Sequence, residues 1–89
     1  MKYINNKLTI EKLSVETIAK KYGTPTYCYS FNKFKKNVLD FKKNFKSISP
    51  LICFAIKSNT NLNLIKEIKR FGLGADVVSM GELMMALKA

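Results

Sequence analysis

One lysine, Lys57, occupies a position from which its amine could take part in covalent chemistry. It directly follows residues 51–56 (LICFAI), an apolar run typical of a strand covered on both faces in a parallel sheet. In α/β barrels the reacting groups lie at the carboxyl ends of such strands. An amine held there against apolar packing can lose its proton and form an imine with an aldehyde. Judged by position alone, Lys57 could equally be a lysine that extends its ammonium from a strand end into water.

Several other chemistries are excluded by residue type. The chain has no histidine, so it can form neither a Ser/His/Asp nor a Cys/His catalytic arrangement, and we expect no metal site. The two cysteines, Cys28 and Cys53, each lie within an apolar run, where a reduced thiol behaves as a small hydrophobic group. We therefore predict that both are buried structural thiols.

Length and composition are those of a soluble globular protein. With 89 residues, 47% of them hydrophobic, the chain can form at most one small domain with a thin core. No segment resembles a signal peptide, and no apolar run approaches the roughly 18 residues of a membrane span. The sequence predicts a cytoplasmic location and no membrane partner.

Caps, turns and apolar spacing predict strands and helices in alternation. In chain order we expect a helix over residues 15–21 capped by Ser14 and ended by Gly23, a strand over 26–30, a helix over 33–45 capped by Asn32, a strand over 51–56, a polar turn over 57–61, a helix over 62–71 stopped by Gly72, a strand over 74–78, and a helix opened by the Ser79-x-x-Glu82 capping box.

This order predicts an α/β fold. Helices that connect apolar strands indicate right-handed parallel βαβ units, the element of doubly wound sheets and of (β/α)8 barrels. The last helix reaches Ala89 without a glycine or proline stop, and a closed barrel needs about 250 residues. We therefore expect the chain to be the N-terminal part of a larger protein, truncated after about two βα units.

Three motifs carry a family resemblance. Residues 54–61 (FAIKSNTN) resemble the lysine motif of the alanine-racemase-like, fold-type III enzymes that use pyridoxal 5′-phosphate. Residues 22–27 (YGTPTY), and residues 72–79 (GLGADVVS) with the following Gly81-Glu82-Leu83, resemble the diaminopimelate decarboxylases. The resemblance runs from about Tyr22 to Ala89.

The resemblance implies a cofactor, a reaction and a fold. Lys57 would hold pyridoxal 5′-phosphate through an imine until the amino-acid substrate displaces it, and would then serve in proton transfer. The pyridine ring would accept the electrons released as CO2 leaves meso-2,6-diaminopimelate, and protonation of that carbon would yield L-lysine. The fold implied is a pyridoxal-phosphate-binding TIM barrel of the alanine-racemase type.

Asp76 is the second candidate catalytic and cofactor-binding residue. The resemblance implies that an acid at this position lies near the imine. A carboxylate there would favour a positively charged imine by Coulomb attraction and could orient the lysine amine. The alternative is an acid at a strand rim that pairs with a nearby lysine or with a helix N-terminus.

Other motif residues have simpler structural explanations. Glu82 matches an acidic position of the family, but its place in the capping box accounts for it. Asn59 is interpreted as turn chemistry. Met80 departs from the family pattern, which most often has a small residue there. Met84 and Met85 are predicted to fill the core.

The resemblance also implies a domain organisation. Residues 1–30 would lead into the barrel and could pack on an absent C-terminal β domain, and residues 31–89 would form the first βα units. The full-length protein is expected to be a homodimer that acts on a small amino acid. The 89 residues alone are expected to decarboxylate nothing.

Other functions remain open at this point. Lys57 alone is equally typical of alanine racemases, of non-catalytic pyridoxal-phosphate carriers, and of ornithine, arginine or carboxynorspermidine decarboxylases. A net charge of +10 is also compatible with a basic nucleic-acid-binding module. Arg70 is the only arginine, however, and the lysines are spread over several predicted helices, without the aromatic interleaving of a groove for a single strand, so we expect no nucleic-acid partner. A complete non-enzymatic protein is the third alternative.

Overall fold

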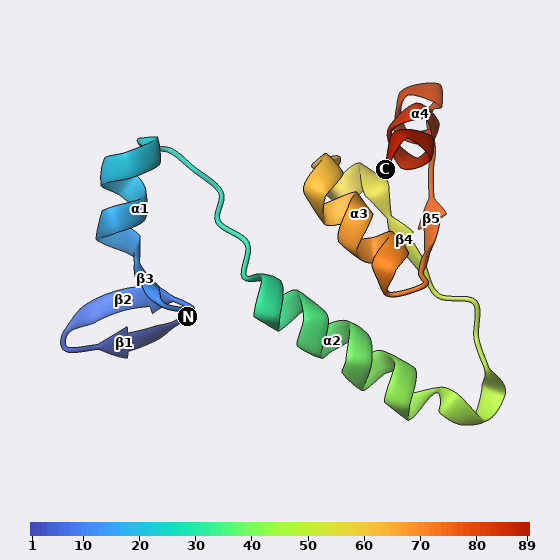
Figure 1. Ribbon diagram of the computed structural model, residues 1–89, viewed down its shortest axis with the longest axis horizontal. Helices are drawn as coiled ribbons and strands as arrows, with labels where there is room; N and C mark the ends of the chain where they lie inside the picture. Colours follow the sequence, from blue (N-terminus) through green and yellow to red (C-terminus); the bar gives the residue numbers. More distant parts are fainter. The chain divides into compact units, whose positions relative to one another are not determined.

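The computed structural model describes residues 1–89, which form two compact units, Met1–Lys43 and Asn44–Ala89. The first contains a small antiparallel sheet and two helices, and the second contains a parallel strand pair with two helices (Figure 1). The prediction of a mixed α/β fold is confirmed. The predicted domain boundary between residues 30 and 31 stays a prediction.

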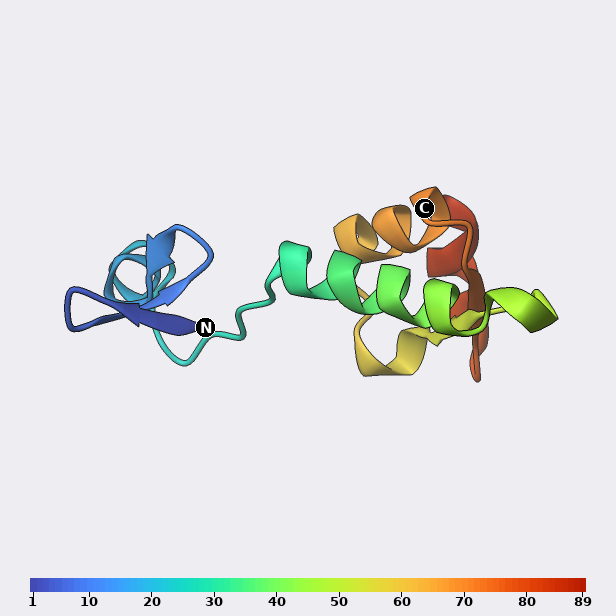
Figure 2. The same ribbon diagram turned by 90° about the horizontal axis from the view of Figure 1, so that it is seen from below.

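The first unit opens with three strands that the sequence did not predict. They are β1 (Lys2–Ile4), β2 (Lys7–Ile10) and β3 (Leu13–Ser14), paired antiparallel in that order. In Figure 2 they belong to the blue, N-terminal part of the ribbon. Asn5 and Asn6 connect β1 to β2, and both have positive φ (48° and 59°), as a two-residue type I′ hairpin requires. Thr9 is buried, and its hydroxyl donates to the carbonyl of Lys2 at 2.8 Å.

Helix α1 (Val15–Tyr22) follows at once and contacts β2 and β3. As predicted, Ser14 caps it, since the Ser14 Oγ accepts from the backbone N–H of Thr17 at 3.0 Å. Gly23 ends it with φ 80°, a conformation that favours glycine.

The predicted strand over residues 26–30 is wrong. These residues form no strand, although their composition favours one, because a strand also needs a partner and no other strand of residues 1–89 pairs with them. Tyr27 is 92% exposed as a result. Cys28 lies in the same segment and is exposed, so its predicted burial is also wrong.

Helix α2 (Phe31–Asn44) begins two residues before its predicted start. The cap is Ser30 instead of Asn32, since the Ser30 Oγ accepts from the N–H of Lys33 at 3.1 Å. The carboxylate of Glu11, in the turn between β2 and β3, accepts from the Ser30 hydroxyl and from the N–H of Asn32, both at 2.9 Å. This long-range partner explains the earlier start.

The second unit is built around two short parallel strands, β4 (Cys53–Ala55) and β5 (Gly74–Asp76), connected by α3 (Leu62–Arg70). Upstream lies a 3-10 turn, η1 (Lys46–Ile48). The predicted βαβ unit is confirmed, but both strands are shorter than expected. Leu51 is 85% exposed, so residues 51–56 are not covered on both faces within this chain. The predicted burial of Cys53 is likewise wrong.

The core of this unit is small and aliphatic. Ile56, Ile65 and Ile68 are its buried side chains, the last two on the apolar face of α3 that the spacing predicts. A Schellman motif ends α3, and Gly72 has φ 64° within it. The N–H of Gly72 donates to the carbonyl of Lys69 at 2.8 Å, and the N–H of Leu73 donates to the carbonyl of Ile68 at 3.2 Å.

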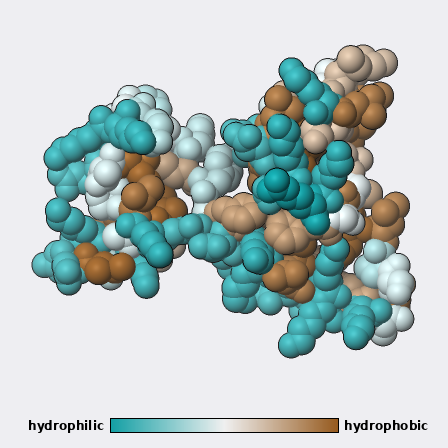
Figure 3. Space-filling model, in the orientation of Figure 1, coloured by the Kyte–Doolittle hydropathy of each residue, from teal (hydrophilic) through white to brown (hydrophobic).

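The last helix, α4 (Met80–Lys88), contacts α3 but leaves an apolar surface exposed. Hydrophobic side chains lie at the surface over this helix (Figure 3). The prediction that Met84 fills the core is wrong for this chain, since its side chain is 60% exposed, whereas Met85 is half-buried. No helix of residues 1–89 combines the length and the apolar character needed to cross a bilayer.

Candidate functional site

The two predicted site residues come from the same edge of the β4–β5 pair. In the parallel register Ala55 is the Cα partner of Asp76, and each is the last residue of its strand. Lys57 follows Ala55 by two residues. Because parallel strands end at a common edge, both candidates emerge at the carboxyl edge of the sheet, where α/β folds place their reacting groups.

Lys57 lies within a 3-10 turn, η2 (Ile56–Ser58), which follows β4 directly. Ile56, immediately before it, is completely buried and anchors the turn. The hydroxyl of Ser58 donates to the carbonyl of Ala55 at 2.8 Å, and the N–H of Asn59 donates to the carbonyl of Ile56 at 2.9 Å. Helix α4 also contacts η2. The backbone of the lysine is therefore held on several sides while its side chain is exposed.

The polar groups of the two candidates are free within this chain. Neither the Lys57 amine nor the Asp76 carboxylate makes a hydrogen bond or an ion pair to any of residues 1–89, and both residues are exposed. The alternative in which Asp76 pairs with a lysine of this chain is therefore not observed. An exposed primary amine that forms no hydrogen bond or ion pair within residues 1–89 fits an aldehyde cofactor, because the nitrogen of the amine is the nucleophile in imine formation and must be accessible to the aldehyde.

The turn between Lys57 and α3 contains a helix cap, Asn61, that we did not predict from the sequence. Asn61 caps α3, since its Oδ1 accepts from the N–H of Asn63 at 2.9 Å, and the Oδ1 of Asn59 accepts from the N–H of Asn61 at 3.0 Å. The sequence signal for the cap is an asparagine directly before the apolar spacing that starts at Leu62.

The start of α4 confirms the predicted capping box. The Oγ of Ser79 accepts from the N–H of Glu82 at 3.2 Å. The carboxylate of Glu82 accepts from the N–H of Val78 at 2.9 Å, one residue earlier than in the usual reciprocal bond. Glu82 is thereby engaged in capping, and Met80, beside it, is 71% exposed.

At β5 the backbone approaches its neighbour closely. A Cβ atom on Gly74 would lie 2.7 Å from the Sγ of Cys53, its partner in the parallel register. That separation is too short for two side chains, so glycine allows the two strands to pair with the cysteine in place. The contact thereby supports the register that sets Asp76 opposite Ala55.

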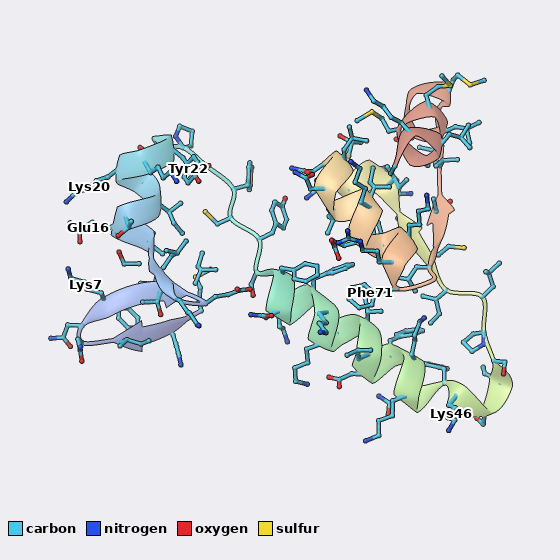
Figure 4. The ribbon with its side chains drawn as sticks, viewed as in Figure 1. Lys7, Glu16, Lys20, Tyr22, Lys46 and Phe71 are labelled. Atoms are coloured by element: carbon cyan, nitrogen blue, oxygen red, sulfur yellow. The ribbon has the colours of Figure 1, made fainter.

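The clearest electrostatic cluster lies in the other unit, around Glu16. Lys7 and Lys20 lie on either side of it, at 3.8 and 2.8 Å from its carboxylate (Figure 4). The hydrogen bond from Lys20, and then its charge, lower the pKa of Glu16, and the same hydrogen bond raises the pKa of Lys20. All three side chains are solvated, as is typical of a surface ion-pair cluster.

The first unit also contains a groove of about 920 Å³. Its lining includes Tyr22, Tyr27, Cys28 and Tyr29, and every lining residue belongs to Met1–Lys43. The groove therefore contains neither Lys57 nor Asp76. Among residues 1–89 no group of three or more histidine, cysteine, aspartate or glutamate side chains could hold a metal ion.

Comparisons with known proteins show the family of the chain. Residues 31–89 match the family model described as "Pyridoxal-dependent decarboxylase, pyridoxal binding domain". The chain is 45% identical to the diaminopimelate decarboxylase of Helicobacter pylori strain J99 over 74 residues, which cover 83% of the chain and 18% of that relative.

Two other relatives align along nearly the whole chain. The chain is 42% identical to the diaminopimelate decarboxylase of Aquifex aeolicus, and the alignment covers 100% of this chain and 21% of that relative. It is 37% identical to the diaminopimelate decarboxylase of Pseudomonas fluorescens, and that alignment covers 98% of this chain and 21% of the relative. The chain thus spans about a fifth of the length of the curated relatives it matches. No solved structure gives a significant match. The chain belongs to the family of pyridoxal-dependent decarboxylases, within their pyridoxal-binding domain.

Proposed function

We propose that Lys57 is the cofactor-anchoring lysine of a pyridoxal-5′-phosphate-dependent decarboxylase. The complete protein would convert meso-2,6-diaminopimelate to L-lysine and CO2, the last step of lysine biosynthesis. The family match and the similarity to diaminopimelate decarboxylases support this reaction. The present chain corresponds to about a fifth of such a protein, so the activity is proposed for the whole.

One observation carries the proposal: the parallel pairing of Ala55 with Asp76. It brings the ends of two neighbouring strands together, one followed by a free amine and the other ending in a free carboxylate. Lysines on a helix face lack such a setting. A nucleic-acid-binding role has no comparable support, because the single arginine, Arg70, forms an ion pair with Glu67.

The two side chains have distinct proposed roles. Lys57 would attach the cofactor through its Nζ and later, as a free amine, hold a proton at Nζ beside the reacting carbon. Asp76 would favour positive charge at that nitrogen through Coulomb attraction and so help to orient it. When bound, pyridoxal phosphate supplies an electron sink for the carbon that loses its carboxylate.

Reductive labelling tests the anchoring role. The intact protein is incubated with pyridoxal 5′-phosphate, reduced with borohydride, digested and mapped by mass spectrometry. The pyridoxyl label should be on Lys57, and Lys57→Arg should abolish both the label and the visible imine absorbance. Lys66→Arg, a matched change at an exposed lysine of α3, should leave both intact. A label at a different lysine refutes the assignment.

A substrate comparison tests the reaction. The full-length protein is supplied with meso-2,6-diaminopimelate, ornithine, arginine or carboxynorspermidine, and CO2 release and the amine product are measured. We expect release from diaminopimelate with equimolar L-lysine. Preference for any of the other three substrates contradicts the proposed specificity. The protein would then still be a decarboxylase of the same family, but for another amino acid.

The proposal extends to the setting of the reaction. We propose that β4, α3, β5 and α4 are early βα units of a (β/α)8 barrel and that the full-length enzyme is a cytoplasmic homodimer. The parallel β4–β5 pair supports the barrel, and the family resemblance supports the rest. Sedimentation of the full-length protein and fractionation of cells test the dimer and the location. A monomer, or a membrane-associated enzyme, contradicts the corresponding part.

A further inference from the structure

Asn59 has two structural roles, one in its backbone and one in its side chain. Its N–H donates to the carbonyl of Ile56 at 2.9 Å and closes the 3-10 turn that contains Lys57. Its side-chain Oδ1 accepts from the N–H of Asn61 at 3.0 Å. The residue is extended, with φ −165° and ψ 109°, and half-buried, whereas its neighbours Ser58 and Thr60 are exposed.

The second hydrogen bond leads into a rigid element. Asn61 caps α3 through its own Oδ1, and its carbonyl accepts from the N–H of Ile65 at 3.0 Å. Ile65 is in turn one of the buried side chains of the unit. The Asn59 side chain thus ties the turn of Lys57 to the start of a helix that is fixed by its core.

We propose that Asn59 is a positioning residue for Lys57: its side-chain hydrogen bond to Asn61 fixes the 3-10 turn against α3 and so sets where the lysine amine stands at the strand edge. The turn has a second fixed end, because the Ser58 hydroxyl bonds the carbonyl of Ala55, the strand partner of Asp76. With both ends held, the lysine backbone loses little conformational freedom when the amine reacts. This inference rests on the proposed function of Lys57.

Amide hydrogen exchange in the intact, cofactor-free protein tests the turn. Asn59→Ala removes the side-chain acceptor and leaves the backbone N–H in place. The amides of residues 59 and 61, each corrected for its intrinsic rate, should then exchange about two- to tenfold faster, the range expected for one lost hydrogen bond. Unchanged exchange at both amides overturns the proposal.

Cofactor attachment supplies the second readout. The initial rate at which pyridoxal 5′-phosphate labels Lys57 under borohydride should fall about two- to tenfold in Asn59→Ala. Asn59→Asp keeps an oxygen acceptor at the same place and should restore the rate, a rescue that general destabilisation does not predict. Asn63→Ala is the matched control, because Asn63 is exposed and takes part through its backbone N–H.

The outcomes separate the two proposals. A wild-type protein without label on Lys57 contradicts the proposed function, while amide exchange still decides whether the Asn59 side chain holds the turn. A wild-type protein that is labelled, with Asn59→Ala labelled equally fast, contradicts the positioning role alone. Should Asn59→Ala lose the far-ultraviolet helical signal, Asn59→Leu replaces it, because leucine is close to asparagine in size and has no hydrogen-bond acceptor. Wild-type labelling of that variant also overturns the proposal.

Discussion

The carboxylate of Glu11 accepts a 2.9 Å hydrogen bond from the backbone N–H of Asn32, 21 residues further along the chain. The same oxygen accepts from the hydroxyl of Ser30, which itself caps α2. One side chain thus connects the β2–β3 turn to the start of α2, the helix with which the residues matched by the family model begin. Glu11 has φ 57°, an uncommon value for a residue with a side chain.

Replacing Glu11 should loosen the beginning of α2. Glu11→Gln removes the negative charge at a helix N-terminus and weakens the acceptor for two donors. We expect faster amide exchange at Asn32 and Lys33, with little change in the middle of α2. Glu16→Gln is the control, since that carboxylate bonds lysine side chains instead of a helix terminus. Equal exchange at Asn32 in the wild type and Glu11→Gln would contradict the tie.

The same contact should depend on pH. The hydrogen bond from the N–H of Asn32, followed by that from Ser30, lowers the pKa of Glu11 below its ordinary 4.5. The charged carboxylate therefore stabilises the folded state above pH 4.5, and this contribution is lost as the pH falls below 4.5 through the lowered pKa. The amide resonance of Asn32 should titrate in that acidic range. In Glu11→Gln the titration should disappear, and its persistence would assign it to another group.

The carboxylate of Asp76 should matter for turnover more than for attachment. Asp76→Asn keeps the size of the side chain and removes the charge proposed to act on the lysine nitrogen. The full-length enzyme should slow about tenfold, the effect of losing an attraction worth about 1.4 kcal/mol in the reacting state. Borohydride labelling of Lys57 should remain. Unchanged turnover would return Asp76 to a structural role.

Two glycines should respond oppositely to alanine. A Cβ on Gly74 would meet the Sγ of Cys53 at 2.7 Å, whereas a Cβ on Gly81 would meet only the Oγ of Ser79, at 4.0 Å. We expect Gly74→Ala to lower the free energy of unfolding by about 1 kcal/mol through overpacking. Gly81→Ala, within α4, should raise it by about 0.5–1 kcal/mol.

A double-mutant cycle isolates the cause of the Gly74 effect. In a Cys53→Ala background the clash is gone, so Gly74→Ala should become neutral or stabilising. Denaturant unfolding of the intact protein measures all four free energies. Additive effects at Gly74 and Cys53 would show that the close contact carries no energy.

Helix caps that depend on contacts between neighbouring residues could be predicted from the sequence. Ser14, Ser79 and Gly72 act as caps where expected, because each bonds within about five residues of itself. The parallel pair was also predictable, since two apolar segments joined by a helix have few other ways to pair. From this pattern Lys57 is expected directly after the first strand and Asp76 within the second, whereas the structure ends the second strand at Asp76 and pairs that residue with Ala55.

The features that only the tertiary structure decided depend on contacts between residues far apart in the sequence. Residues 26–30 have the composition of a strand, yet nothing within residues 1–89 pairs with them, and Cys28 is exposed for that reason. Ser30 instead of Asn32 caps α2 because Glu11 reaches it, a contact with no local sequence signal. Composition and spacing report what a segment can form. Whether it does so depends on which distant group is available to bond it, because a backbone polar group needs a partner.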